Sequence, residues 1–386
     1  MVNTERLHSL MERDGVDVLV AASPESTLYL SGAFIFTQEL IRERLGLVVV
    51  PRSGEPAFIV SRMEQALAKH MSPSSHLHPY TYVEFGNVEA SDAPVPVAVE
   101  RIREWGLEGS VVAVEKSYLS ADLYEILCKL LPKARIIDGS GLLAESRWVK
   151  SQTEVDCLRR AARATESAVW EAFSTAQIGW TEKQIADRIA GNLLRNGADT
   201  VVYVFLACGE RGTMSHWIPG ATPVHPGDIV RVDVAARFSG YWSDFARTVV
   251  AGLPSPEQTR IYRTIVSAHK RLTASMQAGL PIAALYRMAG QMLSEGGLQS
   301  QSLHIGHGLG TQLHERPMIA PFEPGALEPG MVLNLEIFYR DGVRAAYHVE
   351  DLVLVTADGP EVLTRQAGDE GFPVLGDVSL AGGFYQ

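Results

Sequence analysis

Hydrophobic residues in the first 145 positions follow the spacings of short helices and strands in alternation. Leu7, Leu10 and Met11 have the i, i+3, i+4 spacing of one helix face, and Gly15 follows them. Helices are predicted at residues 5–13, 97–104 and 121–131, and strands at 16–22, 45–50, 57–60 and 111–114. The second and third strands form a predicted hairpin, and residues 24–29 are predicted to be a turn into another element. This alternation predicts an α/β domain over residues 1–145.

A different pattern begins near residue 146, where the helical segments become longer. Ser151 precedes Glu154 at capping-box spacing, and an apolar helix face follows, formed by Val155, Leu158, Ala162, Val169 and Phe173. Further helices are predicted at residues 181–195, 254–278 and 281–295. From Asp199, and again over residues 303–363, the apolar period is close to two, which indicates sheet. We therefore expect a second domain at residues 146–386.

One predicted hairpin of the second domain carries a pair of aspartates. Strands are expected at 229–236 and 241–250, joined through Phe238-Ser239-Gly240. The midpoint between Asp233 and Asp244 lies in this turn, so the two carboxylates are predicted to face each other with Cβ atoms about 5 Å apart. Two acids on a solvated face are the alternative interpretation. Because like charges so placed destabilise a sheet, and the flanking residues are mostly apolar, a cation or a shared proton is expected.

A second hairpin repeats the arrangement with glutamates. Strands are predicted at 332–339 and 346–355, with Arg340-Asp341-Gly342 as the turn. Glu336 and Glu350 should then be neighbours across the strands, and each is surrounded by apolar residues. Since a buried carboxylate without a partner is costly, this pair also predicts a bound cation.

His307 is flanked by Gly306 and Gly308, and glycine allows a close approach of backbones. One imidazole and four carboxylates form a hard ligand set suited to divalent metals. The sequence therefore predicts that five residues meet around two metal ions: Asp233, Asp244, His307, Glu336 and Glu350.

Composition narrows the classes of partner. The chain has 34 basic and 45 acidic residues and a formal charge of −11, which argues against nucleic acid and anionic membranes. Cys128, Cys157 and Cys208 are scattered and indicate free thiols in a reducing compartment. The first residues lack the apolar core of a signal peptide, and no apolar run has the length of a membrane span. A cytoplasmic location is expected.

The five residues and their surroundings resemble the pita-bread metallopeptidases, which include methionine aminopeptidase, aminopeptidase P, prolidase and the metal-free creatinase. The matching segments are Pro226-Gly227-Asp228, Gly240-Tyr241-Trp242-Ser243-Asp244-Phe245-Ala246-Arg247-Thr248, Gly306-His307-Gly308-Leu309-Gly310, His314-Glu315 and Pro329-Gly330-Met331-Val332. Tyr29-Leu30-Ser31-Gly32 resembles the N-terminal domain of the prolidase, aminopeptidase P and creatinase branch. The resemblance implies an α+β fold class: a pita-bread catalytic domain with a curved antiparallel sheet, preceded by an α/β creatinase/prolidase-type domain. It also implies a homodimer.

The resemblance further implies roles for individual residues at two ions of manganese, cobalt or zinc. Asp233 would bind one ion bidentately, Asp244 and Glu350 would bridge both, and His307 and Glu336 would complete the second. A metal-bridged hydroxide would attack the carbonyl carbon, and Glu336 would carry its proton to the leaving nitrogen. His216 and His314 match the two histidines that the family keeps beside its metals, and they would hydrogen-bond the oxyanion or the leaving group.

The sequence departs from the family pattern at the substrate end of the site. Ile337 follows Glu336 where peptidases usually have proline, His348 stands where an arginine is usual, and Met318 occupies a place where dipeptide-trimming prolidases often have arginine, with Arg316 nearby. His225, His304 and His348 are interpreted as structural residues or as neighbours of the metal ligands.

Three functions remain open on this basis. The first is an Xaa-Pro dipeptidase or aminopeptidase acting on short peptides. The second is a creatinase-like hydrolase of a small non-peptide amide, and the third is an inactive binding module, whose mark is the loss of ligands. Since no ligand is lost here, a metal-dependent hydrolase of a C–N bond is expected, with an Xaa-Pro dipeptidase or aminopeptidase as the first choice and the creatinase-like hydrolase as the alternative.

Overall fold

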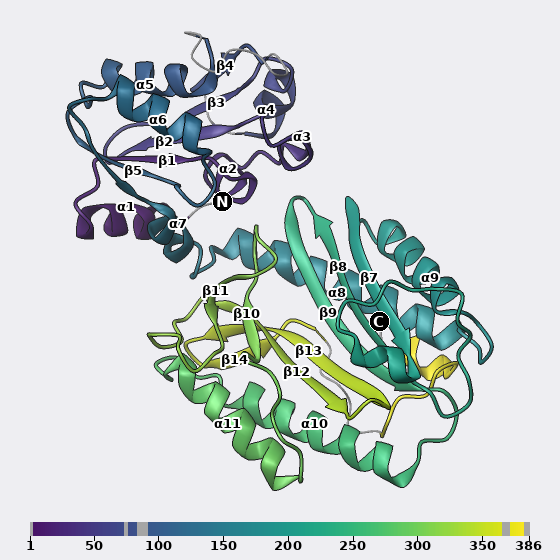
Figure 1. The fold of residues 1–386 in the computed structure, drawn as a ribbon. Coiled ribbons are helices and arrows are strands. Elements are labelled where there is room, and N and C mark those ends of the chain that lie inside the picture. Colours follow the sequence, from purple (N-terminus) through teal and green to yellow (C-terminus); the bar gives the residue numbers. More distant parts are fainter. Residues whose placement is uncertain (1–2, 73–75, 83–91, 365–370, 382–386) are drawn as a thin grey trace. The chain divides into compact units, whose positions relative to one another are not determined.

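The computed structural model describes residues 3–72, 76–82, 92–364 and 371–381. The chain forms two compact units, Met1–Arg147 and Trp148–Gln386 (Figure 1).

The first unit is built on a six-stranded mixed sheet with the strand order β4-β3-β2-β1-β5-β6. Its strands are β1 (Val18–Ala21), β2 (Leu47–Pro51), β3 (Ala57–Ser61), β4 (Leu77–Tyr80), β5 (Val111–Val114) and β6 (Arg135–Asp138). Its helices are α1 (Thr4–Arg13), α2 (Pro24–Ser31), α3 (Phe36–Leu40), α4 (Gln65–Met71), α5 (Pro94–Glu104), α6 (Ala121–Leu130) and α7 (Ser140–Ser146). The predicted strands and the β2–β3 hairpin are confirmed.

The prediction of a turn at residues 24–29 is wrong, because α2 occupies this segment. The Ser23 side chain accepts a hydrogen bond from the Ser26 amide, and Pro24 stands at the start of the helix. Proline is favourable there, since its fixed φ suits the helix and its missing amide hydrogen would have had no partner. Gly32, with φ +74°, ends the helix.

The second unit contains the same succession twice: two helices followed by antiparallel strands (Figure 1). The first succession comprises α8 (Gln152–Thr175), α9 (Glu182–Arg195), β7 (Thr200–Cys208), the 3₁₀ helix η1 (Gly209–Thr213), β8 (Ile229–Phe238) and β9 (Tyr241–Val250). The second comprises α10 (Pro256–Ala274), α11 (Ile282–Glu295), β10 (Gly306–Gly308), β11 (Glu315–Met318), β12 (Val332–Asp341), β13 (Ala345–Thr356) and β14 (Gly359–Val362). A short 3₁₀ helix, η2 (Val378–Ala381), follows.

Each pair of helices packs on its own sheet. Side chains of α8 and α9 form a core with β7, β8 and β9, and those of α10 and α11 form another with β12 and β13. The capping box of Ser151 and Glu154 is present, and the predicted apolar face of α8 is buried.

The two sheets meet where β9 lies against β13. There the Thr248 hydroxyl donates to the His348 carbonyl over 3.0 Å and accepts from the His348 amide over 2.8 Å. These bonds place the two acid-bearing hairpins side by side.

The strand registers confirm one predicted pairing and correct the other. Glu336 pairs directly with Glu350, as predicted. Asp233, however, pairs with Ala246, and Asp244 pairs with Ala235. The two-residue turn Ser239-Gly240, with φ +52° and +81°, lets Phe238 pair with Tyr241 and shifts the register. The aspartates are therefore diagonal neighbours on one face of the sheet, where side chains are still within reach of each other.

Two predictions from composition can also be compared with the structure. Cys128, Cys157 and Cys208 are free thiols, as expected. Among the described residues, no helix combines the length and the apolar character needed to cross a bilayer.

The glycine before His307 is needed for strand pairing, which gives the first testable prediction. A Cβ atom at Gly306 would lie 2.1 Å from the Asn334 carbonyl oxygen, and φ is +149°. Gly306→Ala should therefore lower the free energy of unfolding by about 2–4 kcal/mol. Gly290→Ala is the control, because this position on α11 has open space and alanine favours a helix. Equal stability of both variants in denaturant titrations would contradict the close pairing of β10 with β12.

Candidate metal centre

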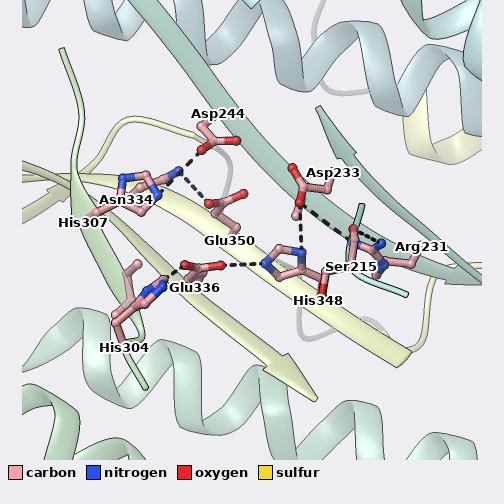
Figure 2. Close-up of polar contacts among 12 residues, drawn as sticks. Ser215, Arg231, Asp233, Asp244, His304, His307, Asn334, Glu336, His348 and Glu350 are labelled. Carbon is pink, nitrogen blue, oxygen red and sulfur yellow. Dashed lines mark hydrogen bonds and ion pairs between the residues drawn. The ribbon is translucent and has the colours of Figure 1, made fainter. Parts of the chain in front are cut away.

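Three carboxylates from three strands form the centre of the site (Figure 2). Asp233 on β8, Asp244 on β9 and Glu350 on β13 each place an oxygen atom within 4.8 Å of the other two. Side chains alternate between the faces of a strand, so the diagonal aspartates of one hairpin and the glutamate of the other point into the same space. This group has the ligand types and spacing of a divalent metal site.

Two further groups share members with the first. Glu336, His348 and Glu350 place one potential ligand atom each within 4.8 Å of one another, and Asp244, His307 and His314 do the same. His307 Nε2 lies 3.7 Å from Asp244 Oδ2. The structure thus brings the five predicted ligands into one continuous cluster.

The electrostatics of the cluster fit bound cations. Burial raises the pKa of Asp244 and of Glu350 well above the usual range, and the neighbouring carboxylates raise both further. Burial also raises the pKa of Asp233. Glu350 Oε2 is buried without a hydrogen-bond partner. Because an unsatisfied buried oxygen is costly, the residues present suit one or more divalent ions.

Glu336 differs from the other three acids. Burial alone would raise its pKa, but contacts with two imidazoles outweigh this effect and hold the pKa well below its usual range. His348 Nε2 lies 3.0 Å from Glu336 Oε2, and His304 Nδ1 lies 3.4 Å from Glu336 Oε1 (Figure 2). Glu336 is therefore an ionised carboxylate with a neighbour on each oxygen.

His307 is held in the neutral form that metal binding requires. Burial, together with the nearby His314, lowers the pKa of His307 to about 4. Its Nδ1 lies 3.0 Å from the Gly308 carbonyl oxygen, and its ring stacks on His314 with centroids 3.8 Å apart. Nε2 is thereby directed toward Asp244.

The other predicted histidines are spread over different parts of the site. His314 is exposed beside His307, and His216 is exposed with its ring centroid 5.2 Å from that of Phe205. His348 is buried within the carboxylate cluster, where it lies beside Asp233 and Glu336. It is therefore a neighbour of the candidate ligands and not a purely structural residue. His225 is 66 % exposed and lies near Asp228, among none of the three ligand groups.

Arg316, whose role the sequence left open, is engaged elsewhere. Its Nη2 atom donates to Glu323 Oε1 over 2.6 Å, and its guanidinium carbon lies 5.8 Å from the Trp148 ring centroid.

Sequence reasoning did not identify three residues that contact the candidate ligands. The Tyr203 hydroxyl donates to Asp244 Oδ1 over 3.1 Å, Asn334 Nδ2 donates to Glu350 Oε1 over 2.6 Å, and Arg231 Nη1 lies 3.8 Å from Asp233 Oδ2. Two of these residues, Asn334 and Arg231, stand two positions before a ligand on the same strand, so strand alternation could have indicated them. Tyr203 could not be found in this way, because the register of β7 against β8 contains a bulge.

Comparison with known protein families agrees with this geometry. Residues 156–357 match the model of metallopeptidase family M24, and residues 4–149 match the creatinase/prolidase N-terminal domain. The chain belongs to metallopeptidase family M24 and is a metallopeptidase. The expected family and the two-part pita-bread fold are confirmed.

Individual relatives cover nearly the whole chain. An Xaa-Pro dipeptidase of Pyrococcus furiosus is 25% identical over 363 residues, which cover 94% of this chain and 97% of the relative. The crystal structure of dipeptidase PepE from Mycobacterium ulcerans is similar with a TM-score of 0.80 and 26% identity, over 97% of this chain and 98% of that one. An X-Pro aminopeptidase structure from Thermotoga maritima has the same fold, with a TM-score of 0.81 and 22% identity over 97% of this chain and 100% of that one.

The assignment of ligands predicts a loss of metal in variants. Asp244→Ala and Glu350→Ala remove the two carboxylates shared between ligand groups. We expect each variant, after loading and desalting, to retain less than about half of the metal of the parent, because each of these carboxylates belongs to two of the three ligand groups. Asp358→Ala, in an exposed turn, is the control. Unchanged metal content by elemental analysis would remove these residues from the ligand set.

The raised pKa values predict how stability depends on pH. In the metal-free protein, Asp244 and Glu350 keep their protons above the ordinary carboxyl pKa values of 3.8 and 4.5, where the unfolded chain has already released them. The folded state then binds more protons, so its stability falls as the pH rises through this window. Bound metal reverses the effect, because it favours the ionised carboxylates.

The difference in Tm between the metal-loaded and the metal-free protein should therefore widen from pH 5 to pH 7. The double variant Asp244→Asn, Glu350→Gln is the control for the metal-free protein: without these two titrating groups, its Tm in the absence of metal should fall less between pH 5 and pH 7 than that of the parent. If the difference in Tm between the metal-loaded and the metal-free parent stays constant or narrows from pH 5 to pH 7, raised pKa values of Asp244 and Glu350 are excluded as the cause.

Proposed function

We propose that the protein is a dinuclear-metal-dependent peptidase that removes an amino-terminal residue preceding proline from short peptides. The observation that carries the proposal is the cluster of four carboxylates and His307, in which Asp244 and Glu350 are buried and each belongs to two neighbouring ligand groups. Shared carboxylates are how two metal ions are held about 3.5–4 Å apart. The names of full-length relatives, Xaa-Pro dipeptidases of Pyrococcus furiosus and of Lactobacillus delbrueckii, support the substrate class.

In this proposal each acid has a distinct task. Asp233 would hold the first ion, His307 and Glu336 would hold the second, and Asp244 and Glu350 would be shared between them. When bound, such ions would supply a water of lowered pKa as the nucleophile. The chain retains all five ligands, which favours this chemistry over the metal-free hydrolysis of creatinase.

Glu336 is the proposed proton carrier. Its low pKa keeps it ionised and able to accept a proton, and His304 and His348 fix the orientation of both its oxygens. The proton taken from the attacking water then passes from Glu336 to the leaving nitrogen.

His314 and His216 are the proposed hydrogen-bond donors to the substrate. Both are exposed toward solvent, unlike His307, and so are accessible to a peptide. His314 stacks on a metal ligand, and His216 lies close enough to Asp233 to influence its pKa. Donors placed around a tetrahedral oxyanion stabilise the charge that develops there. The cytoplasmic location and the homodimer remain predictions.

The substrate class can be tested with a panel of compounds. The metal-loaded protein should hydrolyse Xaa-Pro dipeptides or longer Xaa-Pro peptides with added Mn²⁺ or Co²⁺, and chelation should abolish turnover. The panel includes Xaa-Ala peptides as a control for proline specificity and creatine as a non-peptide C–N substrate. Turnover of creatine alone would favour the small-molecule hydrolase, and full activity after removal of every divalent ion would exclude the proposal.

The role of Glu336 gives a separate prediction. Glu336→Gln preserves the shape of the side chain but removes the base, so kcat should fall by about 10²–10⁴-fold. Glu361→Gln, an exposed glutamate on β14, serves as the control. Activity of Glu336→Gln within a few-fold of the parent would assign the proton transfer to another group, and metal content measured on the same sample separates this effect from loss of an ion.

A further inference from the structure

The segment that carries His216, residues 211–217, is held mainly by polar contacts. Within η1 only Gly212 is buried, and Met214 is 47 % exposed. Apolar burial therefore contributes little to the position of this segment. Its two ends are held by the buried Glu182, which accepts from Arg211 Nε over 2.9 Å and from Trp217 Nε1 over 3.0 Å.

The middle of the segment is bound by two arginines from different sheets. Arg231 on β8 donates from Nη2 to the carbonyl oxygens of Met214 and Ser215, over 3.2 Å and 2.6 Å. Arg340 on β12 donates from Nε to the Thr213 carbonyl oxygen and from Nη2 to Ser215 Oγ, each over 2.8 Å. Three consecutive carbonyl groups immediately before His216 are thus bound by guanidinium groups.

The two arginines are themselves fixed in place. Both guanidinium groups pack on Phe338, with their carbon atoms 5.2 Å and 4.5 Å from the ring centroid. Arg231 is 1 % exposed and also lies 3.8 Å from Asp233 (Figure 2). A planar guanidinium has a rigid arrangement of donors, so Arg231 fixes the distance between a candidate metal ligand and the backbone that precedes His216.

We propose that Arg231 and Arg340 are positioning residues that hold His216 at a set place relative to Asp233. This inference rests on the proposed function, in which His216 donates a hydrogen bond to the reacting substrate. Displacing a catalytic group by about 1 Å can lower the reaction rate by up to about 10²-fold. Fixing the backbone beside His216 is therefore expected to matter for turnover. The arginines act on the reaction through His216 and need not touch the peptide.

Coupling between Arg340 and His216 tests the proposal. Arg340→Met keeps the aliphatic stem on Phe338 but removes both donors, and it should lower kcat by about tenfold in the parent. In the His216→Ala background the same change should lower kcat less than about twofold, because the group being positioned is absent. Arg340→Lys should retain intermediate activity. The control is Arg344→Met, at an exposed arginine that pairs with Asp341 and should leave kcat unchanged.

A second measurement is independent of activity. Trypsin should cut after Arg211 several-fold faster in Arg340→Met than in the parent or Arg344→Met, while metal content and Tm stay the same. Unchanged cleavage overturns the proposal even if the enzyme is a peptidase. A full tenfold loss of kcat that persists in the His216→Ala background also overturns it. If the parent hydrolyses no peptide but Arg340→Met is still cleaved faster, the arginines hold the segment that carries His216, and the proposed peptidase function is rejected.

Discussion

The crowding of four carboxylates in a buried site is the constraint on which the second unit depends. In a region of low dielectric constant, like charges repel strongly and each acid tends to keep its proton. Burial and this repulsion raise the pKa values of Asp244 and Glu350, and a divalent cation would stabilise their ionised forms. The surrounding fold is organised to hold these groups together in spite of their repulsion.

Several features of the backbone serve this purpose. The two-residue turn at Ser239-Gly240 places the aspartates diagonally, so both point to one face without being directly opposed. The hydrogen bonds between Thr248 and His348 join the aspartate hairpin to the glutamate hairpin. Gly306 lets β10 approach β12 closely and thereby brings His307 to the acids. Because each hairpin supplies only part of the ligand set, the site exists only when both halves pack together.

The residues that hydrogen-bond to the acids give Asp244 and Glu350 a different environment from that of Glu336. Tyr203 binds one oxygen of Asp244, and Asn334 binds one oxygen of Glu350. The side chains of Tyr203 and Asn334 thus leave the other oxygen of each carboxylate available for a metal ion. Glu336, in contrast, has an imidazole at each oxygen and remains ionised. The same residue type therefore acquires different properties from its neighbours, which is the condition for separating metal binding from proton transfer.

In the second unit the sequence by itself determined the long helices and the two hairpins, because periodicity and turn residues are local properties of the chain. The ligand types on these hairpins, together with His307, indicated the five residues that converge. The directly opposed Glu336 and Glu350 could be predicted from the position of their turn alone. Only the tertiary structure decided the diagonal placement of Asp233 and Asp244, since a shift in the turn changes the register of every pair beyond it. It alone also placed Tyr203 beside Asp244 and His348 beside Asp233, because contacts between strands distant in sequence depend on how the strands and sheets pack.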